Sequence, residues 1–206
     1  MRLYRPLLIL KLLFPKAVFR VSTGSRDLFL TFDDGPRPHS TPAILDVLDN
    51  NSIKALFFCS GKEAEKHPDL INLIKSKGHI IGNHGYNHLD GFRTGNYEYI
   101  EDVKKSARFT SPAIFRPPYG RIRRSQYKVL VKDYQIVFWD LMPYDFDIKM
   151  GHKRILHVLK KKIRPGSVIV LHDNDRKSPV CFLEDFIRFA KDKGYNFRLI
   201  KLSGKE

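Results

Sequence analysis

The segment Thr31-Phe32-Asp33-Asp34-Gly35-Pro36 decides how this chain is interpreted. It ends an apolar run that begins at Leu28 and is typical of a buried strand. Side chains alternate along a strand, so two adjacent carboxylates at its end point in different directions. One carboxylate is then able to bind a metal ion while its neighbour transfers a proton. The Gly-Pro pair turns the backbone away and leaves the site open. Taken alone, the segment fits a plain turn equally well, so the rest of the chain has to decide.

Strand-like and helix-like segments alternate along the chain, and this predicts an α/β fold with a parallel sheet. Strands are expected at residues 28–32, 53–59, 79–82, 113–116, 135–139, 168–171 and 196–202. Helices are expected at residues 41–50, 63–77, 97–108, 124–132, 153–162 and 182–193. Seven strands fit either a barrel or an open doubly wound sheet, and periodicity does not choose between them.

Length and charge restrict the function classes. A chain of 206 residues is the size of one domain with a full core. The net charge of +15 makes nucleic acid, an anionic membrane face and an acidic polymer electrostatically plausible partners. No zinc-finger, RNA-recognition or helix-turn-helix pattern is found, which argues against nucleic acid. Oligomeric state is not predicted.

The N-terminal segment, residues 1–27, is basic and apolar. Its apolar run from Leu7 to Phe14 is interrupted by Lys11 and is too short to span a bilayer. It also lacks the apolar core and cleavage site of a standard secretory signal. Two alternatives stay open: the segment lies on an anionic membrane surface, or it packs along the outside of the domain. The expected location is cytoplasmic or at a membrane surface.

Polar residues follow the ends of five expected strands. They are Asp33, Asp34, His84, His88, Arg116, Asp140, Asp145, His172 and Asp173. In an α/β barrel the active site is built at the C-terminal ends of the strands. If the sheet closes in this way, these side chains converge on one mouth.

A metal site is the first function that these residues suggest. His84 and His88 are four residues apart, within reach of one ion, and Gly82 and Gly85 favour a tight loop there. A carboxylate from Asp34 completes a two-histidine, one-carboxylate set with open positions, as in catalytic metal sites. The histidine pair alone is weak support, because surface or core histidines have the same spacing.

The remaining polar residues suggest a hydrolytic reaction. A bound divalent ion such as zinc lowers the pKa of water and polarises a carbonyl. Asp33 is then a candidate general base, and His172 a candidate acid for the leaving group. Asp145 is placed to orient His172, and Arg116 to hold Asp33. The alternatives are a buried structural histidine at 172 and a solvated loop acid at 145.

The ordered motifs resemble one family. T-F-D-D-G-P is followed by H-x-x-x-H, then by R-P-P-Y-G at residues 116–120, D-F at 145–146 and L-H-D at 171–173. In this order they resemble the polysaccharide deacetylases, the carbohydrate esterases of family 4 that share the NodB homology domain. The resemblance runs from about residue 28 to 202. It implies a deacetylase domain at residues 28–206 with a distorted TIM-like (β/α)7 barrel.

The resemblance also implies roles. Asp33 resembles the base, Arg116 the residue that holds it, His172 the acid and Asp145 its partner. Asp34, His84 and His88 resemble the ligands of Zn²⁺, or of Co²⁺, Ni²⁺ or Mn²⁺. The expected substrate contacts are the backbone N–H of Tyr119 and the side chains of Leu171, Phe146 and Trp139. The implied reaction is hydrolysis of the N-acetyl group of an N-acetylglucosamine-type residue in a poly- or oligosaccharide.

Two positions depart from the family pattern. Gly85 stands where the family usually has Ser or Thr, which removes a hydroxyl that braces the metal loop. Phe146 stands where the family usually has Trp, so the pocket wall loses an indole N–H. Neither residue is an expected metal ligand, and activity is still predicted.

Three other functions compete with this interpretation. An Fe(II) oxygenase also uses two histidines and one carboxylate, but it needs neither Asp33, Arg116 nor His172. A catalytically weak glycan-, membrane- or nucleic-acid-binding relative fits the positive charge. An O-acetyl polysaccharide esterase uses the same metal chemistry, with a leaving group that needs less protonation.

Overall fold

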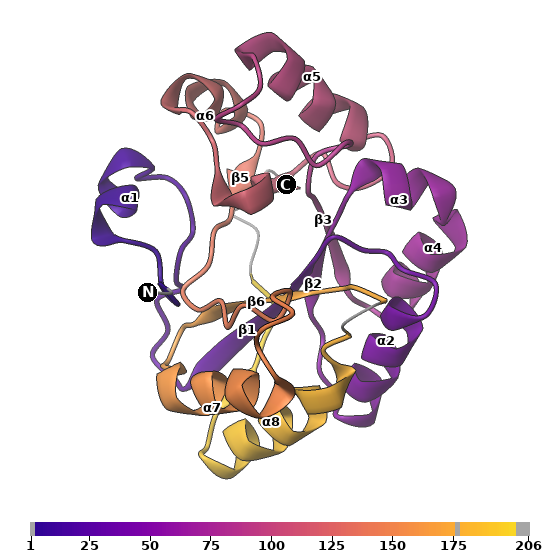
Figure 1. The fold of residues 1–206 in the computed structure, drawn as a ribbon, viewed down its shortest axis with the longest axis vertical. Helices are drawn as coiled ribbons and strands as arrows, with labels where there is room; N and C mark the ends of the chain where they lie inside the picture. Colours follow the sequence, from indigo (N-terminus) through magenta and orange to yellow (C-terminus); the bar gives the residue numbers. More distant parts are fainter. Residues whose placement is uncertain (1–2, 176–177, 201–206) are drawn as a thin grey trace.

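A computed structural model describes residues 3–175 and 178–200 of the chain, and a parallel sheet forms its centre (Figure 1). Its strands are β1 (Asp27–Asp33), β2 (Leu56–Cys59), β3 (Ile80–Asn83), β4 (Ile114–Phe115), β5 (Gln135–Ile136), β6 (Val168–His172) and β7 (Asn196–Phe197). The strand order is β5-β4-β3-β2-β1-β6, and β7 pairs with β1. All these pairings are parallel. The expected α/β fold with a parallel sheet is therefore confirmed.

The sheet curls so that its two ends approach each other. The segment that follows β5 lies against β6, because Leu141 of this segment forms a parallel bridge with Ile169 of β6. The sheet is curved as half a barrel, and the helices lie around its outside (Figure 1). The full count of a (β/α)7 barrel and the domain division at residue 27 stay predictions.

Eight α-helices and one 3-10 helix are found in the described residues. They are α1 (Leu8–Leu13), α2 (Ser40–Asn50), α3 (Gly61–Lys66), α4 (Pro68–Ser76), α5 (Asn96–Ser106), η1 (Pro118–Gly120), α6 (Arg124–Leu130), α7 (His152–Lys162) and α8 (Val180–Asp192). The single helix expected at 63–77 is two helices, because Pro68 lacks an N–H and begins a new one. Residues 201–202 of the last expected strand lie outside the described residues.

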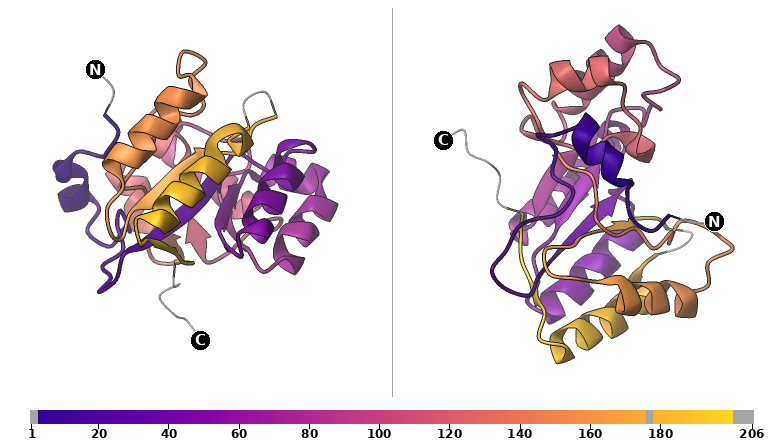
Figure 2. Two further views of the ribbon diagram at one scale, coloured as in Figure 1. Left: turned by 90° about the horizontal axis from the view of Figure 1, so that it is seen from below. Right: turned by 90° about the vertical axis from the view of Figure 1, so that its left-hand side faces the viewer.

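The hydrophobic core lies between the sheet and the helices. Leu28, Leu30 and Phe32 of β1 are buried in one cluster together with apolar side chains of α2, α7 and α8. Helices α7 and α8 lie side by side along one side of the molecule (Figure 2). Burial of β1 on both faces explains its continuous apolar sequence, and this rigid strand carries Asp33 at its end.

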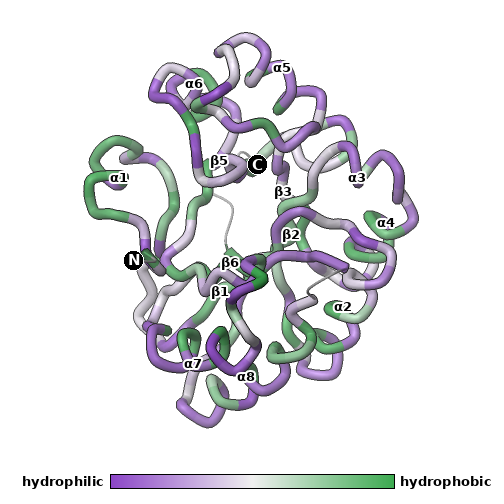
Figure 3. Tube along the Cα trace, viewed as in Figure 1, coloured by the Kyte–Doolittle hydropathy of each residue, from purple (hydrophilic) through white to green (hydrophobic). Residues whose placement is uncertain are grey.

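The N-terminal segment packs against the domain, which confirms the packing alternative for this part of the chain. Phe14 and Phe19 are buried and stack on Phe138, and Val18 pairs with Val137. Helix α1, which the sequence did not predict, lies in the gap of the helical ring between α6 and α7 (Figures 1 and 2). It has no buried residue, and its trace is largely apolar (Figure 3). Within the described residues, no helix combines the length and apolar character needed to cross a membrane.

Candidate active site

The register of the sheet brings the polar residues to one edge. Asp33 at the end of β1 is in register with His172 at the end of β6. On the other side of β1, Asp33 is in register with Phe58 of β2. Strand β2 pairs with β3, and His84 is the first residue after β3. Asp34 leaves the strand with φ 76°, a left-handed conformation in which Asp is enriched among non-glycine residues. The two adjacent aspartates thus occupy different positions, as the sequence predicted.

Asp34, His84 and His88 form a group that is able to hold a metal ion. Their ligand atoms lie within 4.8 Å of one another. Asp34 Oδ1 is 3.2 Å from His88 Nε2 and 3.6 Å from His84 Nε2. The His84 Nδ1–H donates to the carbonyl of Arg116 at 2.8 Å, which leaves Nε2 without a proton and directed at Asp34. An outer hydrogen bond of this kind is what orients a metal-ligating histidine.

Protonation of this group suits metal binding. Burial lowers the pKa of His84 to about 4, so its imidazole is neutral at pH 7. Burial of Asp34 opposes its charge, but the hydrogen bond from His88 and the positive charge of His172 hold its pKa well below the usual range. A neutral imidazole and an ionised carboxylate are the forms that bind a divalent cation. The donor set therefore fits a metal ion.

The loop between the two histidines is held by Asp102 of α5. The Asp102 carboxylate accepts hydrogen bonds from the N–H groups of Tyr86 at 2.7 Å and Asn87 at 3.0 Å. It also accepts one from the Asn87 side chain at 2.8 Å. A Cβ at Gly85, where φ is 73°, would lie 3.0 Å from Asp102 Oδ2. Gly85 therefore lacks the hydroxyl of a Ser or Thr, but its missing side chain leaves space for the Asp102 carboxylate, which holds the same loop by hydrogen bonds.

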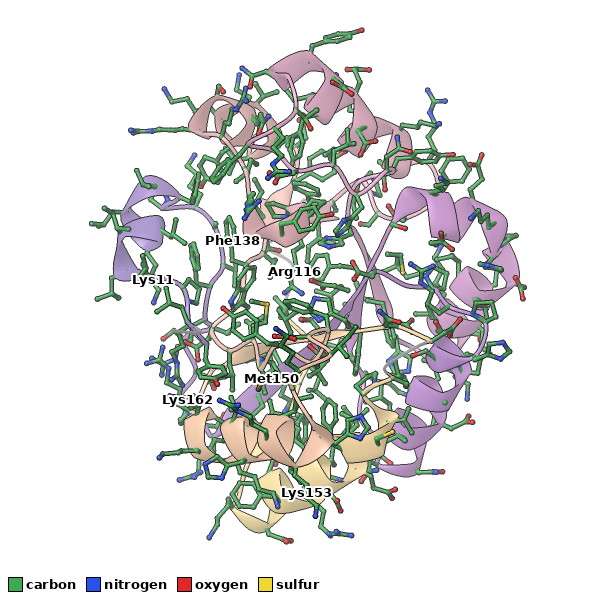
Figure 4. All side chains as sticks on the ribbon, in the orientation of Figure 1. Lys11, Arg116, Phe138, Met150, Lys153 and Lys162 are labelled. Carbon is green, nitrogen blue, oxygen red and sulfur yellow. The ribbon has the colours of Figure 1, made fainter. Side chains whose placement is uncertain are left out.

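Arg116 is fully buried at the centre of the molecule (Figure 4), where it holds Asp33. Its Nη1 donates to Asp33 Oδ1 at 2.6 Å and to Thr31 Oγ1 at 2.8 Å. Its Nε and Nη2 donate to the carbonyls of Val137 at 3.2 Å and Phe138 at 2.9 Å. A buried guanidinium with this many acceptors is rigid, so it fixes one oxygen of Asp33 and leaves the other free.

His172 and Asp145 form a hydrogen-bonded pair on the opposite side of Asp34 from the histidine loop. Asp145 Oδ1 lies 2.8 Å from His172 Nδ1, and its Oδ2 accepts the His172 backbone N–H at 2.7 Å. Burial opposes a charge on His172, but Asp145, Asp34 and Asp33 together raise its pKa to about 9. The ring of Phe146 lies 4.8 Å from the ring of His172. The pair presents a protonated imidazole at neutral pH.

A cavity of about 570 Å³ contains most of the predicted site. Its lining includes Asp33, Asp34, His84, His88, Tyr119, Trp139, Phe146 and His172. Arg116 and Asp145 lie behind this lining, in contact with Asp33 and His172. Two other strand-end acids turn elsewhere: Asp140 pairs with Arg164 and Ser167, and Asp173 accepts from Thr41.

Leu171 does not line the cavity, so its predicted place in the pocket wall is wrong. It is fully buried in the core, and Val170 is the residue of β6 that lines the cavity. Side chains two residues apart share one face of a strand. Val170 therefore faces the same side as His172, and Leu171 faces the other.

The turn at η1 brings Tyr119 to the metal-binding group. Tyr119 has φ 58°, and its ring lies 4.5 Å from that of His88. At the next position, Gly120 has φ 64°, and a Cβ there would lie 2.3 Å from the Trp139 ring. Only glycine allows this contact, so Trp139 and the turn pack directly against each other at the cavity wall.

Several lining residues had no signal in the sequence. Leu3, Pro6, Leu7 and Leu10 come from the N-terminal segment, and Met142 from the loop after β5. The role of Asp102 was also missed. These residues belong to no motif and lie far in sequence from the residues that they support. The apolar run of residues 7–14, interrupted by Lys11, fits a membrane surface or packing against the domain, and neither interpretation places these side chains in the cavity.

Comparisons with known proteins identify the relatives of this chain. A family model described as polysaccharide deacetylase matches residues 20–137. The chain is 32% identical to a peptidoglycan-N-acetylglucosamine deacetylase of Bacillus cereus over 189 residues, which cover 87% of this chain and 88% of that protein. It is 33% identical to a chitooligosaccharide deacetylase of Bradyrhizobium over 159 residues, 73% of this chain and 72% of the relative.

Solved structures share the fold of this chain. A crystal structure of a peptidoglycan N-acetylglucosamine deacetylase superposes with a TM-score of 0.84 at 32% identity, covering 90% of this chain and 91% of the other. Bacillus subtilis PdaA, a family 4 carbohydrate esterase, gives a TM-score of 0.81 at 28% identity, with coverage of 95% and 90%.

Proposed function

This chain belongs to the polysaccharide deacetylase family, and from that premise we propose that it hydrolyses N-acetyl groups on N-acetylglucosamine-type residues of a poly- or oligosaccharide. One observation carries the proposal. The Asp34–His84–His88 group, the Asp33–Arg116 pair and the His172–Asp145 pair lie around a single cavity. The enclosing fold is proposed to be a distorted (β/α)7 barrel.

Asp34, His84 and His88 would hold the metal ion. Two imidazole nitrogens and one carboxylate oxygen suit Zn²⁺, and Co²⁺, Ni²⁺ or Mn²⁺ are accepted by the same ligands. When bound, the ion supplies Lewis acidity that activates water and polarises the acetyl carbonyl.

The side chains around the metal move the protons. Asp33, with one oxygen fixed by Arg116, accepts a proton from the attacking water. The backbone N–H of Tyr119 donates to the oxygen of the acetyl carbonyl as negative charge develops there. His172 donates a proton to the departing amine nitrogen as the C–N bond breaks. Water and acetamide are thereby converted into acetate and a free amine. Trp139, Val170 and Phe146 line the space for the acetyl group and the sugar.

The proposal is tested by acetate release from chitin oligomers, peptidoglycan strands and O-acetylated polysaccharides. We expect N-acetylated sugars to be the best substrates, a chelator to abolish activity, and Zn²⁺ or Co²⁺ to restore it. Release only from O-acetylated substrates would replace the proposal by the esterase alternative. Binding of chitin oligomers by metal-loaded protein without any acetate release would favour a weak or inactive relative, and dioxygen consumption would indicate an oxygenase.

The pH dependence follows from the His172–Asp145 pair. The pKa of His172 is raised from 6.5 to about 9, so the pair stabilises the fold fully below pH 6.5 and loses this contribution as pH rises through about 9. We expect kcat to fall along an alkaline limb in the same range, because the proton donor is lost. In Asp145→Asn this limb moves toward lower pH, since burial then acts on the imidazole without its main counter-charge.

An NMR titration of His172 in the metal-free protein measures its pKa directly, beside the pH profile of the enzyme. An unchanged His172 pKa and an unchanged alkaline limb in Asp145→Asn would remove Asp145 from its proposed role. Asp185→Asn, which breaks an exposed ion pair with Arg188 on α8, serves as the control and leaves both quantities as in the wild type.

Contact with an anionic membrane surface remains part of the proposal. On α1, Leu8 is 77% exposed and Leu12 is 80% exposed, with Lys11 between them. Exposed leucines beside a basic side chain support interfacial binding. Sedimentation with anionic vesicles tests this contact, and we expect it to weaken in the double variant Leu8→Asn/Leu12→Asn.

A further inference from the structure

We propose that the N-terminal segment forms a binding site for the alkyl or acyl chain of an amphiphilic N-acetylated amino sugar. This inference rests on the proposed deacetylase function and names the class of substrate. The site is the N-terminal wall, defined here as Leu3, Pro6, Leu7 and Leu10. All four line the cavity that also contains Asp34, His84 and His88.

The chemistry of the wall differs from that of a glycan subsite. Sugars are bound by hydrogen-bonding side chains and by aromatic rings, whereas the side chains of the N-terminal wall are aliphatic. Leu3 is 46% exposed and Leu7 is 54% exposed, so both have apolar surface to cover. Met142 and Phe146 line the same cavity from the loop after β5. This apolar space and the metal group belong to one cavity, so a chain attached to a sugar at the metal group has an apolar surface to bind in the same cavity.

The wall is built into the fold. The Tyr144 hydroxyl donates to the carbonyl of Leu3 at 2.9 Å, and the Met142 N–H donates to the carbonyl of Tyr4 at 3.0 Å. The rings of Tyr4 and Tyr144 meet edge to face at 5.8 Å. The loop that makes these bonds also carries Asp145 and Phe146, so the wall is positioned relative to the catalytic pair.

The N-terminal wall itself is uncharged. Among the described lining residues, the arginines already have partners. Arg121 pairs with Asp90 at 2.7 Å, and Arg5 lies 3.5 Å from Asp140 and donates to the Lys162 carbonyl. Each guanidinium thus faces a carboxylate of this chain, and the four side chains of the N-terminal wall carry no charge themselves. The wall therefore matches the neutral apolar part of a substrate.

The test compares octyl and methyl β-glycosides of N-acetylglucosamine. Burial of a CH₂ group contributes about 0.8 kcal/mol, so partial burial of an octyl chain is expected to lower KM about 10-fold or more relative to the methyl glycoside. In Leu7→Asn this preference is expected to disappear, so that the octyl and methyl glycosides give equal kcat/KM. Leu7 is the N-cap of α1, a position that favours Asn, so the variant retains its helix.

Leu12→Asn is the matched control. Leu12 lies on the same helix but is not among the residues that line the cavity, and it is expected to leave the octyl preference intact. Equal loss of the preference in both variants would mean that the chain binds the outer surface of α1, and it would overturn the proposal. Equal kcat/KM for octyl and methyl glycosides in the wild type would overturn it as well.

A binding measurement separates this inference from the deacetylase function. Octyl β-glucoside carries no acetyl group, and calorimetry is expected to show that it binds the wild type and Leu12→Asn but not Leu7→Asn. If no substrate releases acetate, the proposed function fails, while this binding pattern still supports the wall. If octyl β-glucoside does not bind the wild type, the wall proposal fails whatever the outcome of the acetate assay.

Discussion

Asp33→Asn is expected to bind its metal as the wild type does and to lose nearly all turnover. The substitution removes the carboxylate that accepts the proton of water, and general-base help is worth about 10²- to 10⁴-fold in rate. The proposed metal-binding atoms belong to Asp34, His84 and His88 and are unchanged. Acetate release at saturating substrate measures the loss, and elemental analysis of the same sample measures the metal.

Thr31→Val is the control for this variant. Both Asp33 and Thr31 accept from Nη1 of Arg116, at 2.6 Å and 2.8 Å. Thr31→Val removes one partner of the buried guanidinium and keeps the base, so it lowers stability and retains most of the turnover. Thermal unfolding of both variants separates the loss of a buried partner from the loss of the base. Asp33→Asn with a turnover within about tenfold of the wild type would rule out Asp33 as the base.

His84→Ala is expected to abolish metal binding and, with it, activity. The variant removes one of three ligands, and its loss of affinity should exceed the roughly 10- to 100-fold change that follows loss of an outer partner. The His84 imidazole is buried and anchored through Nδ1 to the carbonyl of Arg116, so no neighbouring side chain takes its place. Titration of metal-free protein with Zn²⁺ measures the affinity without an activity assay.

His79→Ala provides a matched histidine control. His79 precedes β3, as His84 follows it, and is also buried, with its Nδ1 accepting the Ala55 N–H at 3.1 Å. Burial lowers its pKa to about 4, so the two histidines share a neutral charge state at pH 7. We expect His79→Ala to lose stability and to keep its metal. Equal metal affinity of His84→Ala and the wild type would contradict the proposed ligand set.

The positions of the site residues next to strand ends were predictable, because the apolar pattern that indicates a strand is local in the sequence. Asp33, Asp34, His84 and His88 follow apolar runs that are readable in the sequence, and the sheet register then brings Asp33 level with His172. The prediction for Leu171 failed by one position, since a single step along a strand exchanges the two faces of the sheet. The break at Pro68 was readable from its missing N–H, although the helix was expected to continue through it.

The positions of Asp102 and of the N-terminal wall were not predictable, because they depend on contacts across long stretches of chain. Asp102 supports a loop about fifteen residues before it, and Leu3 is bound by Tyr144 at a separation of 141 residues. No local pattern reports such contacts. They form when the curled sheet brings α5 to the metal loop and the N-terminal segment to the cavity mouth.

The kinds of chemical group at the site were therefore determined by short motifs, because a motif fixes which positions of the chain carry carboxylate, imidazole and guanidinium groups. Their protonation states were decided by the fold, since burial lowers the pKa of His84 to about 4 while Asp145 and the nearby aspartates raise that of His172 to about 9. The shape of the site was decided by packing. Which face of β6 lines the cavity, which carboxylate braces the metal loop and which leucines form its apolar wall all follow from how the elements fit together. Buried area and register govern that fit, and both are properties of the folded chain as a whole.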